Sequence, residues 1–351
     1  MNRAADLLAR CLAGIRRLSG LFAACAVFAT PLTAAQAQQV PAAQLDQVTQ
    51  VQSAFDSVFG TEMRGPRSYS TPFEQQLAAV AEASRGRIGV AALDLSSGRT
   101  IQVLGDQRFP MASTSKVAIA ATFLEGVDQG RWSLTSEFPL MIPVASTPFS
   151  SAVAPVREGA YMSAERLIEL MLTRSNNYAT DALLKVVGGP AAVNAWVRRA
   201  GIQDWQIDRD IATLVRDDGA IDPAQVIDTR DSATPLAMVR LLAGLYEGKW
   251  LSTSSRDVLL GAMGRCITGK QRIRAGMPEG VQVLHKTGSL SNTSSDIGII
   301  ETPEGRTFAV AIYVTGQGGR PGREARIASI ARTIYDGYLT DSPNYRHTAS
   351  R

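Results

Sequence analysis

The sequence predicts an α+β fold, in which one antiparallel five-stranded sheet carries an inserted helical lobe. Two strand-like stretches lie between residues 88 and 104, and three more lie between residues 281 and 315. Short apolar runs bounded by turn residues are typical of strands. The long segment between the two groups has helical spacing of its apolar residues instead. The simplest arrangement pairs both groups in one sheet and leaves a cleft beside the second lobe, where binding sites are favoured.

Local signals predict the individual elements. Pro72 suits the first position of a helix, which we expect over 73–83. Two strands joined by a turn follow, and the inserted lobe then carries a series of helices. Three strands and a closing helix end the domain. The predicted strands are 88–93, 100–104, 281–286, 296–301 and 307–315, and the later helices are 117–124, 163–172, 181–187, 190–200, 235–246, 254–263 and 323–338.

The first 37 residues have the features of an export signal. Basic residues come first, an apolar run covers residues 21–35, and a small-x-small cleavage site ends at Ala37. The run is short and contains Pro31, which argues against a membrane anchor. We therefore expect cleavage after Ala37 and a periplasmic protein, with the route open because Arg16-Arg17 also suits a twin-arginine signal.

The charge balance argues against a nucleic-acid partner. The chain of 351 residues has a net charge of +4 and a pI of about 9.1. The first 37 residues hold four arginines against one aspartate, a charge of +3, so that the remainder carries only +1. A hydrophobic content of 45% is enough for a substantial core. We expect a linker over residues 38–70, a globular domain over 71–340 with its helical lobe at about 113–266, and a tail over 341–351.

Cysteine and histidine are scarce, and this limits the possible chemistry. Cleavage would remove Cys11 and Cys25, leaving Cys266 without an intramolecular disulfide partner. The chain has two histidines, His285 and His347, which are too few for a His-based zinc site and leave little choice for a Ser-His-Asp triad. We expect no metal and no cofactor. His285 precedes Lys286 on a strand, should face the opposite side of the sheet, and is interpreted as structural.

The first candidate motif is Ser113-Thr114-Ser115-Lys116, at the start of a predicted helix. Ser113 and Lys116 are three residues apart, so that the hydroxyl and the amine can share a helix face. A serine needs a base to become a nucleophile, and the helix dipole favours a neutral lysine nearby. Taken alone, the pattern also fits an ordinary helix cap with a solvated lysine.

Two further motifs follow in the chain. Ser175-Asn176-Asn177 lies after a helix end, where Ser175 can shuttle a proton and Asn177 can orient an amide. Lys286-Thr287-Gly288-Ser289 ends a predicted strand. There Gly288 allows a substrate to approach the backbone, and the neighbouring side chains offer a charge and hydroxyls. A polar turn and a strand terminus are the simpler interpretations of each motif alone.

In this order, Ser-x-x-Lys, Ser-x-Asn and Lys-Thr-Gly form the signature of penicillin-recognising serine enzymes. From about residue 72 to 339 the chain resembles class A β-lactamases. The resemblance implies a nucleophile at Ser113, a candidate base at Lys116, and a proton relay through Ser175 helped by Lys286. It also implies a monomer without cofactor that acts on a β-lactam or a peptidoglycan stem peptide. The implied substrate-binding residues are Asn177, Thr287, Gly288 and Ser289, with an oxyanion hole at the N–H groups of Ser113 and Ser289.

The chain departs from the family pattern in the Ω-loop. Arg209 and Asp231 resemble the ion pair that closes this loop, over a span several residues longer than usual. Ile211 stands where the family has the glutamate that positions the deacylating water. Asp210 and Asp222 are the alternative bases.

Two other positions also depart from the pattern. Asn176 replaces an aspartate, and Ser295 replaces an arginine that often binds the substrate carboxylate. Arg323 or Arg326 of the last helix is the candidate substitute, although both also fit an exposed helix face. These departures leave three functions open: a β-lactamase, a D-alanyl-D-alanine peptidase that releases penicillin slowly, and a non-catalytic cell-wall or β-lactam-binding module.

Overall fold

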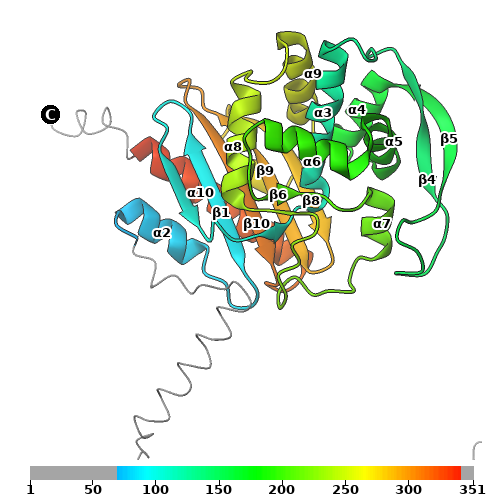
Figure 1. Cartoon of the computed structure of the whole chain (residues 1–351). Coiled ribbons are helices and arrows are strands. Elements are labelled where there is room, and N and C mark those ends of the chain that lie inside the picture. The colour runs from blue at the N-terminus through cyan, green and yellow to red at the C-terminus, as the bar shows by residue number, and fades with distance from the viewer. Residues whose placement is uncertain (1–68, 341–351) are drawn as a thin grey trace, which may run out of the picture. The chain divides into compact units, whose positions relative to one another are not determined.

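The computed structural model describes residues 69–340 (Figure 1). The expected export signal, residues 38–68 of the expected linker and the C-terminal tail lie outside the described residues. Within residues 69–340, no helix is both long and apolar enough to cross a membrane.

The central sheet has five antiparallel strands in the order β2-β1-β10-β9-β8. This confirms the predicted sheet, in which β1 pairs with β10 and joins the two ends of the domain. Strand β10 has the predicted bounds, whereas β8 and β9 are longer than predicted. The strands are β1 (Ile88–Asp94), β2 (Thr100–Val103), β8 (Gln282–Leu290), β9 (Thr293–Glu301) and β10 (Thr307–Thr315).

Helices cover both faces of this sheet. Helices α2 (Pro72–Val80) and α10 (Arg320–Thr340) pack on one face, and α8 (Pro235–Tyr246) packs on the other (Figure 1). Side chains along a strand point alternately to the two faces, so β10 contributes to both cores. Val310 and Ile312 join the core under α10, while Ala309, Ala311 and Tyr313 join the larger core.

The second lobe is built around α3 (Lys116–Asp128), which is buried over most of its length and therefore reads as apolar all round. It is packed by α4 (Ala164–Thr173), α5 (Asn177–Val187), α6 (Gly189–Arg199) and α9 (Thr253–Gly264). Gly188 ends α5 with a left-handed φ of 103°, as its position after the helical pattern predicts.

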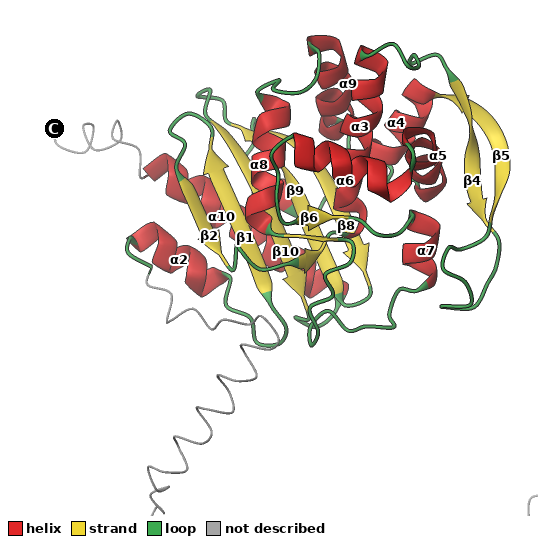
Figure 2. Cartoon of the chain, viewed as in Figure 1, coloured by secondary structure: helices red, strands yellow, loops and turns green. Residues whose placement is uncertain are grey.

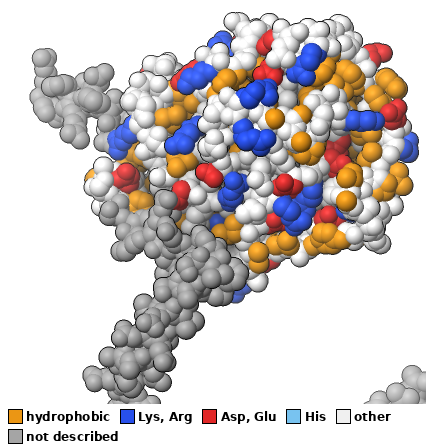
Figure 3. All heavy atoms as spheres, in the orientation of Figure 1, with side chains coloured by type: hydrophobic (Ala, Val, Ile, Leu, Met, Phe, Trp, Pro, Cys, Tyr) orange, Lys and Arg blue, Asp and Glu red, His pale blue; other side chains and the backbone are white. Residues whose placement is uncertain are grey.

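The lobe is not entirely helical, which the sequence did not predict. Strands β4 (Glu137–Pro143) and β5 (Val156–Ser163) form a hairpin at its edge (Figure 2). Most of its side chains are partly or fully exposed, so the strands lack the apolar pattern that would have indicated them. Exposed apolar side chains gather over this end of the molecule (Figure 3).

Small elements connect the lobes near the predicted site. Strands β3 (Phe109–Pro110), β7 (Ser232–Ala233) and β6 (Trp205–Gln206) form a short three-stranded sheet. Helix α7 (Ile211–Arg216) lies in the loop that precedes β7. The 3₁₀ turn η1 (Ala112–Ser115) directly precedes α3. A second 3₁₀ turn, η2 (Ile273–Gly276), precedes β8.

Candidate active site

Ser113 lies in the 3₁₀ turn η1, and α3 begins three residues later at Lys116. Ala112 precedes the serine with a φ of 49°, a left-handed conformation that costs a non-glycine residue about 1–3 kcal/mol. The side chains of Thr114 and Ser115 fold back onto the carbonyls of Met111 and Ala112 at 2.8 and 2.9 Å. Ser113 is the partly exposed hydroxyl of this run.

Lys116 is fully buried and points at the second motif. Its Nζ donates to the carbonyl of Ser175 at 2.8 Å and to Oδ1 of Asn177 at 2.7 Å. Burial holds the pKa of Lys116 well below its ordinary value, and the charge of Lys286 lowers it further. A lysine with a lowered pKa can act as a general base near neutral pH.

Ser175 lies between two lysines. The Nζ of Lys116 is 3.3 Å from its Oγ, and the Nζ of Lys286 is 3.0 Å from the same atom. The residue has a φ of 57°, which again places a non-glycine residue in the left-handed region. Burial lowers the pKa of Lys286 to about 8, although the charges of Cys266 and Asp296 oppose that shift. The two amines therefore share one hydroxyl through which a proton can pass.

Asn176 explains why an amide is tolerated in the middle of the second motif. Its side chain caps α5 by accepting a hydrogen bond from the N–H of Ala179 at 2.9 Å. Asparagine and aspartate are about equally good at this position. Asn177 is then the first residue of the helix, where its Oδ1 reaches Lys116.

Gly288 brings the third motif against the nucleophile turn. A Cβ at this position would lie 2.6 Å from the carbonyl oxygen of Met111 and 2.4 Å from Oγ of Ser295. Strand β8 can therefore contact η1 at this point only because the residue has no side chain. The next residue, Ser289, follows directly along the same strand.

Arg272 is a residue of this site that sequence reasoning missed. It is buried, and its guanidinium donates to the carbonyls of Gly288 and Ser295 at 2.8 and 2.7 Å and to Oγ of Ser289 at 2.7 Å. Glu324 accepts a further hydrogen bond at 3.0 Å. Nothing in the local sequence distinguishes Arg272 from its neighbours, because its role depends on long-range contacts.

The arginines expected at this position from the sequence lie elsewhere. Arg323 donates to Oγ of Ser294 at 3.1 Å and to the carbonyls of Gly316 and Gly318. Arg326 donates to the carbonyl of Val80 at 3.1 Å. Arg272, unlike these two, has a hydrogen bond to the Lys-Thr-Gly-Ser motif.

Comparisons with known proteins agree with this geometry. Residues 72–338 match the model of the Beta-lactamase enzyme family. The chain is 32% identical over 268 residues to β-lactamase CTX-M-4 of Salmonella typhimurium, which covers 76% of this chain and 89% of the relative. The chain belongs to the class A β-lactamase family.

Solved structures of β-lactamases support the same assignment. A variant of the last common ancestor of Gram-negative bacteria class A β-lactamases superimposes with a TM-score of 0.67, at 34% identity, over 78% of this chain and 100% of that one. A β-lactamase from Chitinophaga pinensis also gives 0.67, at 28% identity, over 76% of this chain and all of its own.

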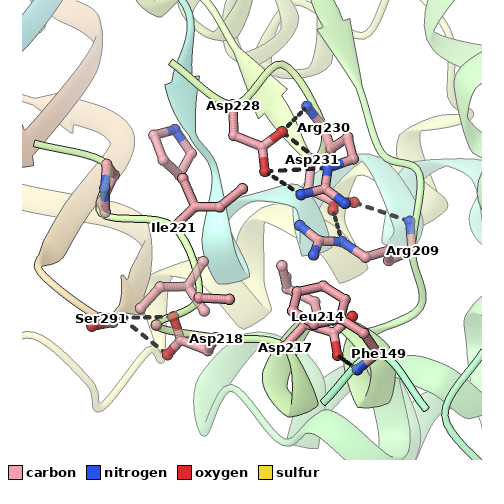
Figure 4. Close-up of a pocket in the computed structure, with 15 residues that line it drawn as sticks. Phe149, Arg209, Leu214, Asp217, Asp218, Ile221, Asp228, Arg230, Asp231 and Ser291 are labelled. Carbon is pink, nitrogen blue, oxygen red and sulfur yellow. Dashed lines mark hydrogen bonds and ion pairs between the residues drawn. The ribbon is translucent and has the colours of Figure 1, made fainter. Parts of the chain in front are cut away.

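The Ω-loop of this class A relative is closed by the expected ion pair. The Nε of Arg209 lies 2.6 Å from Oδ2 of Asp231 (Figure 4). The other carboxylate oxygen of Asp231 accepts from the backbone N–H groups of Asp208 and Arg209. The long loop is also attached to the β8–β9 turn, because the carboxylate of Asp218 accepts from the N–H of Ser291 at 2.9 Å.

Ile211, which the sequence resemblance puts at the position of the family's glutamate, begins α7. Its N–H donates to Oδ1 of Asp181 at 2.7 Å, and the N–H of Ala212 donates to Oδ2 at 2.9 Å. Asp181 lies one turn after Asn177 on α5, so one helix face contacts both Lys116 and the Ω-loop. Burial raises the pKa of Asp181 to about 7, against the effect of its backbone hydrogen bonds. The isoleucine side chain is 4% exposed.

The two alternative bases have structural hydrogen bonds of their own. Asp210 caps α7 by accepting from the N–H of Thr213 at 2.7 Å. Asp222 is exposed and accepts from Nδ2 of Asn292 at 2.7 Å. Neither carboxylate has a hydrogen bond to Ser113, Lys116 or Ser175 within residues 69–340.

A small cavity of about 60 Å³ lies under the Ω-loop (Figure 4). Its walls include the apolar side chains of Phe149, Leu214 and Ile221 together with Arg209. Within the described part of the chain, no group of three or more His, Cys, Asp or Glu side chains is placed to hold a metal ion.

Proposed function

We propose that this protein opens the β-lactam amide through an acyl-enzyme on Ser113. The observation that carries the proposal is the pair of buried amines around one hydroxyl, with Lys116 and Lys286 both within 3.3 Å of Oγ of Ser175. A purely structural hydrogen-bond network would not need two buried lysines that face the same neutral oxygen. Each buried amine, when charged, raises the free-energy cost of charging the other.

We assign the following roles in acylation. Lys116, as the neutral amine, accepts the proton of Ser113 while Oγ attacks the carbonyl carbon. Ser175 passes a proton to the leaving nitrogen and is replenished from the amines beside it. The N–H groups of Ser113 and Ser289 bind the oxyanion, and such donors contribute about 2.7–4 kcal/mol each in comparable enzymes. Asn177 orients the substrate amide.

The substrate carboxylate is assigned to a cationic site on the sheet side. Lys286 supplies the positive charge, and Arg272, whose guanidinium is paired with Glu324, holds the Ser289 hydroxyl. The hydroxyls of Thr287 and Ser289 complete the site. Arg272 replaces Arg323 in this role, because Arg323 is hydrogen-bonded to the loop before α10.

Hydrolysis of the acyl-enzyme is the step that the Ω-loop leaves without its usual base. The chain has no glutamate between Glu169 and Glu247, and Ile211 is buried at the position concerned. This observation favours a second candidate function, a penicillin-binding D-alanyl-D-alanine peptidase that releases the drug slowly. A non-catalytic binding module is disfavoured, because reversible binding does not require the proton path.

Intact-mass spectrometry with benzylpenicillin over time tests these functions, with Ser113→Ala as the control. A transient adduct with steady loss of drug supports the β-lactamase. An adduct that persists for hours supports the peptidase, and stem peptides then become the substrates to test. If the unmodified chain forms no adduct, the acyl-enzyme proposal is wrong and the binding module is favoured.

We also infer export to the periplasm and a monomeric state. The basic and apolar pattern before Ala37 supports export. Cell fractionation with mass measurement of the mature N-terminus tests the cleavage site. Sedimentation at several concentrations tests the monomer.

A further inference from the structure

Three successive residues of the long Ω-loop bind to two different elements beside the candidate site. Arg216 and Asp217 form an ion pair at 2.8 Å, and their side chains are only 6% and 4% exposed. The next residue, Asp218, accepts the N–H of Ser291 with its two carboxylate oxygens, at 2.9 and 3.0 Å. Residues 216–222 are called the strap below, because their two ends are attached to different parts of the molecule (Figure 4).

The first end of the strap is attached to the loop of the β4–β5 hairpin by largely buried contacts. The carboxylate of Asp217 accepts from the N–H of Phe149 at 3.1 Å. Just before the strap, the hydroxyl of Thr213 accepts from the N–H of Ala154 at 2.8 Å, and both residues are buried. Water does not compete for buried hydrogen bonds, so this end of the strap is fixed.

The second end is attached to the β8–β9 turn by exposed contacts. One is the hydrogen bond from Ser291 to Asp218, and the other runs from Nδ2 of Asn292 to Asp222 at 2.7 Å. Segments that are held by solvent-exposed hydrogen bonds open at the lowest free-energy cost. The strap therefore has a fixed end at the hairpin and a releasable end at the sheet.

The strap connects the two sides of the proposed substrate site. On the helical side, Asp181 lies one turn after Asn177 on α5 and accepts from the N–H of Ile211, at the start of α7. On the sheet side, Ser291 follows Ser289 by two residues. A continuous path thus runs from the helix that orients the substrate amide, through α7 and the strap, to the strand end that supplies the oxyanion hole.

The acyl substituent of a bound penicillin faces this path. The acylamino group and the carboxylate lie at opposite ends of a penicillin, and the carboxylate is assigned to Lys286, so the substituent leaves Asn177 on the side of the strap. The cavity under the strap measures about 60 Å³, whereas a cavity that holds benzene measures about 150 Å³. An aromatic ring attached directly to the acyl carbonyl therefore does not fit while both ends of the strap are attached.

We propose that the strap closes the Ω-loop side of the acylation site, and that its sheet end must release before a β-lactam with a bulky group directly on the acyl carbonyl can acylate Ser113. Substrates with a slender or flexible acyl substituent need no release, because a CH₂ group lets the ring turn outward. Asp218 is a positioning residue in this scheme, since it acts through Ser291. The inference rests on the acyl-enzyme function proposed above and names the β-lactams that this function favours.

Two penicillins with the same ring system test the strap. Benzylpenicillin has a CH₂ group between its phenyl ring and the carbonyl, whereas methicillin has a dimethoxyphenyl ring directly on the carbonyl. In Asp218→Ala, the second-order acylation rate with methicillin should rise about fivefold relative to benzylpenicillin, the effect of losing one exposed charged contact. Asp257→Ala removes a carboxylate on α9 that is 65% exposed and should leave the ratio of the two rates unchanged.

A double variant removes both exposed contacts. Asn292 has a φ of 49°, so Asn292→Gly deletes its amide group and keeps the backbone conformation. The ratio of methicillin to benzylpenicillin acylation should rise further in Asp218→Ala/Asn292→Gly than in Asp218→Ala. The same ratio in the unmodified chain and the double variant overturns the proposal.

Hydrogen exchange compares the two ends of the strap without any substrate. The N–H of Ala154 reports the fixed end, and the N–H of Ser291 reports the releasable end. Exchange at Ser291 should be the faster of the two and should become faster still in Asp218→Ala, while exchange at Ala154 stays the same. If the two groups exchange equally fast in the unmodified chain, the strap has no releasable end and the proposal is wrong.

Ser113→Ala separates failure of the strap from failure of the proposed function. This variant forms no adduct, so calorimetry gives the reversible Kd of each penicillin with and without Asp218→Ala. A ratio of Kd values that shifts toward methicillin supports the strap, even if the unmodified chain forms no adduct and the acyl-enzyme function is wrong. Adducts on the unmodified chain together with an unshifted ratio refute the strap alone.

Discussion

The Nζ of Lys286 lies 3.0 Å from the Oγ of Ser175, and this contact joins the two lobes of the molecule at one hydroxyl. Lys286 comes from the sheet, whereas Ser175 belongs to the turn before α5 in the helical lobe. Lys116 approaches the same oxygen at 3.3 Å from within that lobe. The protonation of the two amines should therefore govern the chemistry, and several measurements follow from it.

Acylation by benzylpenicillin should slow as the pH rises through about 8. Burial lowers the pKa of Lys286 to that value, so higher pH removes the ammonium that contacts Ser175 and attracts the carboxylate. In Lys286→Arg, the fall in the acylation rate at high pH should disappear, because a guanidinium stays charged. Stopped-flow measurement of acylation between pH 6 and 10 gives the pH dependence of the rate for the unmodified chain and for Lys286→Arg. If the rate of Lys286→Arg still falls at high pH, the titration belongs to another group.

Ile211→Glu should speed release of the acyl group. It places a carboxylate at the Ω-loop position where the family has its base, and general-base catalysis contributes about 10²–10⁴-fold. Ile211→Gln has nearly the same shape without a base and is the matched control. The decay of the Ser113 adduct after removal of free penicillin gives both rates. Equal decay in the two variants would show that the loop does not direct a base at the acyl group.

Asp181→Asn should destabilise the Ω-loop by about 1–3 kcal/mol, the usual cost of a lost buried acceptor. The two carboxylate oxygens accept from Ile211 and Ala212, and an amide can accept with only one of its atoms. Urea unfolding and hydrogen exchange at Ile211 measure the effect. Asp222→Asn changes an exposed carboxylate of the same loop and should stay within about 0.5 kcal/mol.

Asp181→Asn should also alter how the free energy of unfolding depends on pH. Asp181 has its pKa raised to about 7 by burial, so its contribution to stability is fully present below its unfolded value of 3.8. That contribution is lost as the pH rises through about 7, where the buried group ionises. The free energy of unfolding of Asp181→Asn should lack this component between pH 4 and 8. A variant with the same pH slope as the unmodified chain would contradict this assignment.

Arg272→Gln should weaken recognition of the substrate carboxylate, whereas Arg323→Gln should leave it nearly unchanged. Only Arg272 bonds to Ser289 among the arginines in residues 69–340. We expect the second-order acylation rate with benzylpenicillin to fall about tenfold or more in Arg272→Gln, given the 1.5–3 kcal/mol of a charged hydrogen bond. Benzylpenicillin methyl ester lacks the carboxylate and is the control substrate. An equal loss with the ester would indicate a structural role for Arg272.

Gly288→Ala should reduce acylation more than stability. The new Cβ would lie 2.6 Å from the carbonyl of Met111, so β8 must move away from the nucleophile turn. A displacement of about 1 Å can cost 10²-fold in rate. Gly319→Ala, whose Cβ would have only an ordinary contact at 3.7 Å, is the control. The acylation rate and the thermal unfolding of both variants are measured. Equal acylation rates in Gly288→Ala and Gly319→Ala would contradict the prediction.

Much of the fold could be predicted from local patterns. Strand 307–315 is an apolar segment and has its predicted bounds, whereas the polar halves of β8 and β9, residues 287–290 and 293–295, carry no apolar pattern and were missed. The β4–β5 hairpin was missed because its side chains face solvent and include prolines, so no alternation marks it. The 3₁₀ turn at Ser113 was expected as a regular helix start, since both conformations accept the same residues.

The three motifs and their order were determined by the sequence itself, because each depends on residues that are close in the chain. Tertiary structure decided how the motifs meet: Lys116 is 59 residues from Ser175, and Lys286 is 111 residues from it. It also decided which groups are buried, and hence the lowered pKa values of the two lysines. Arg272 and Asp181 became recognisable only then, because burial and long-range contact are properties that no local pattern contains.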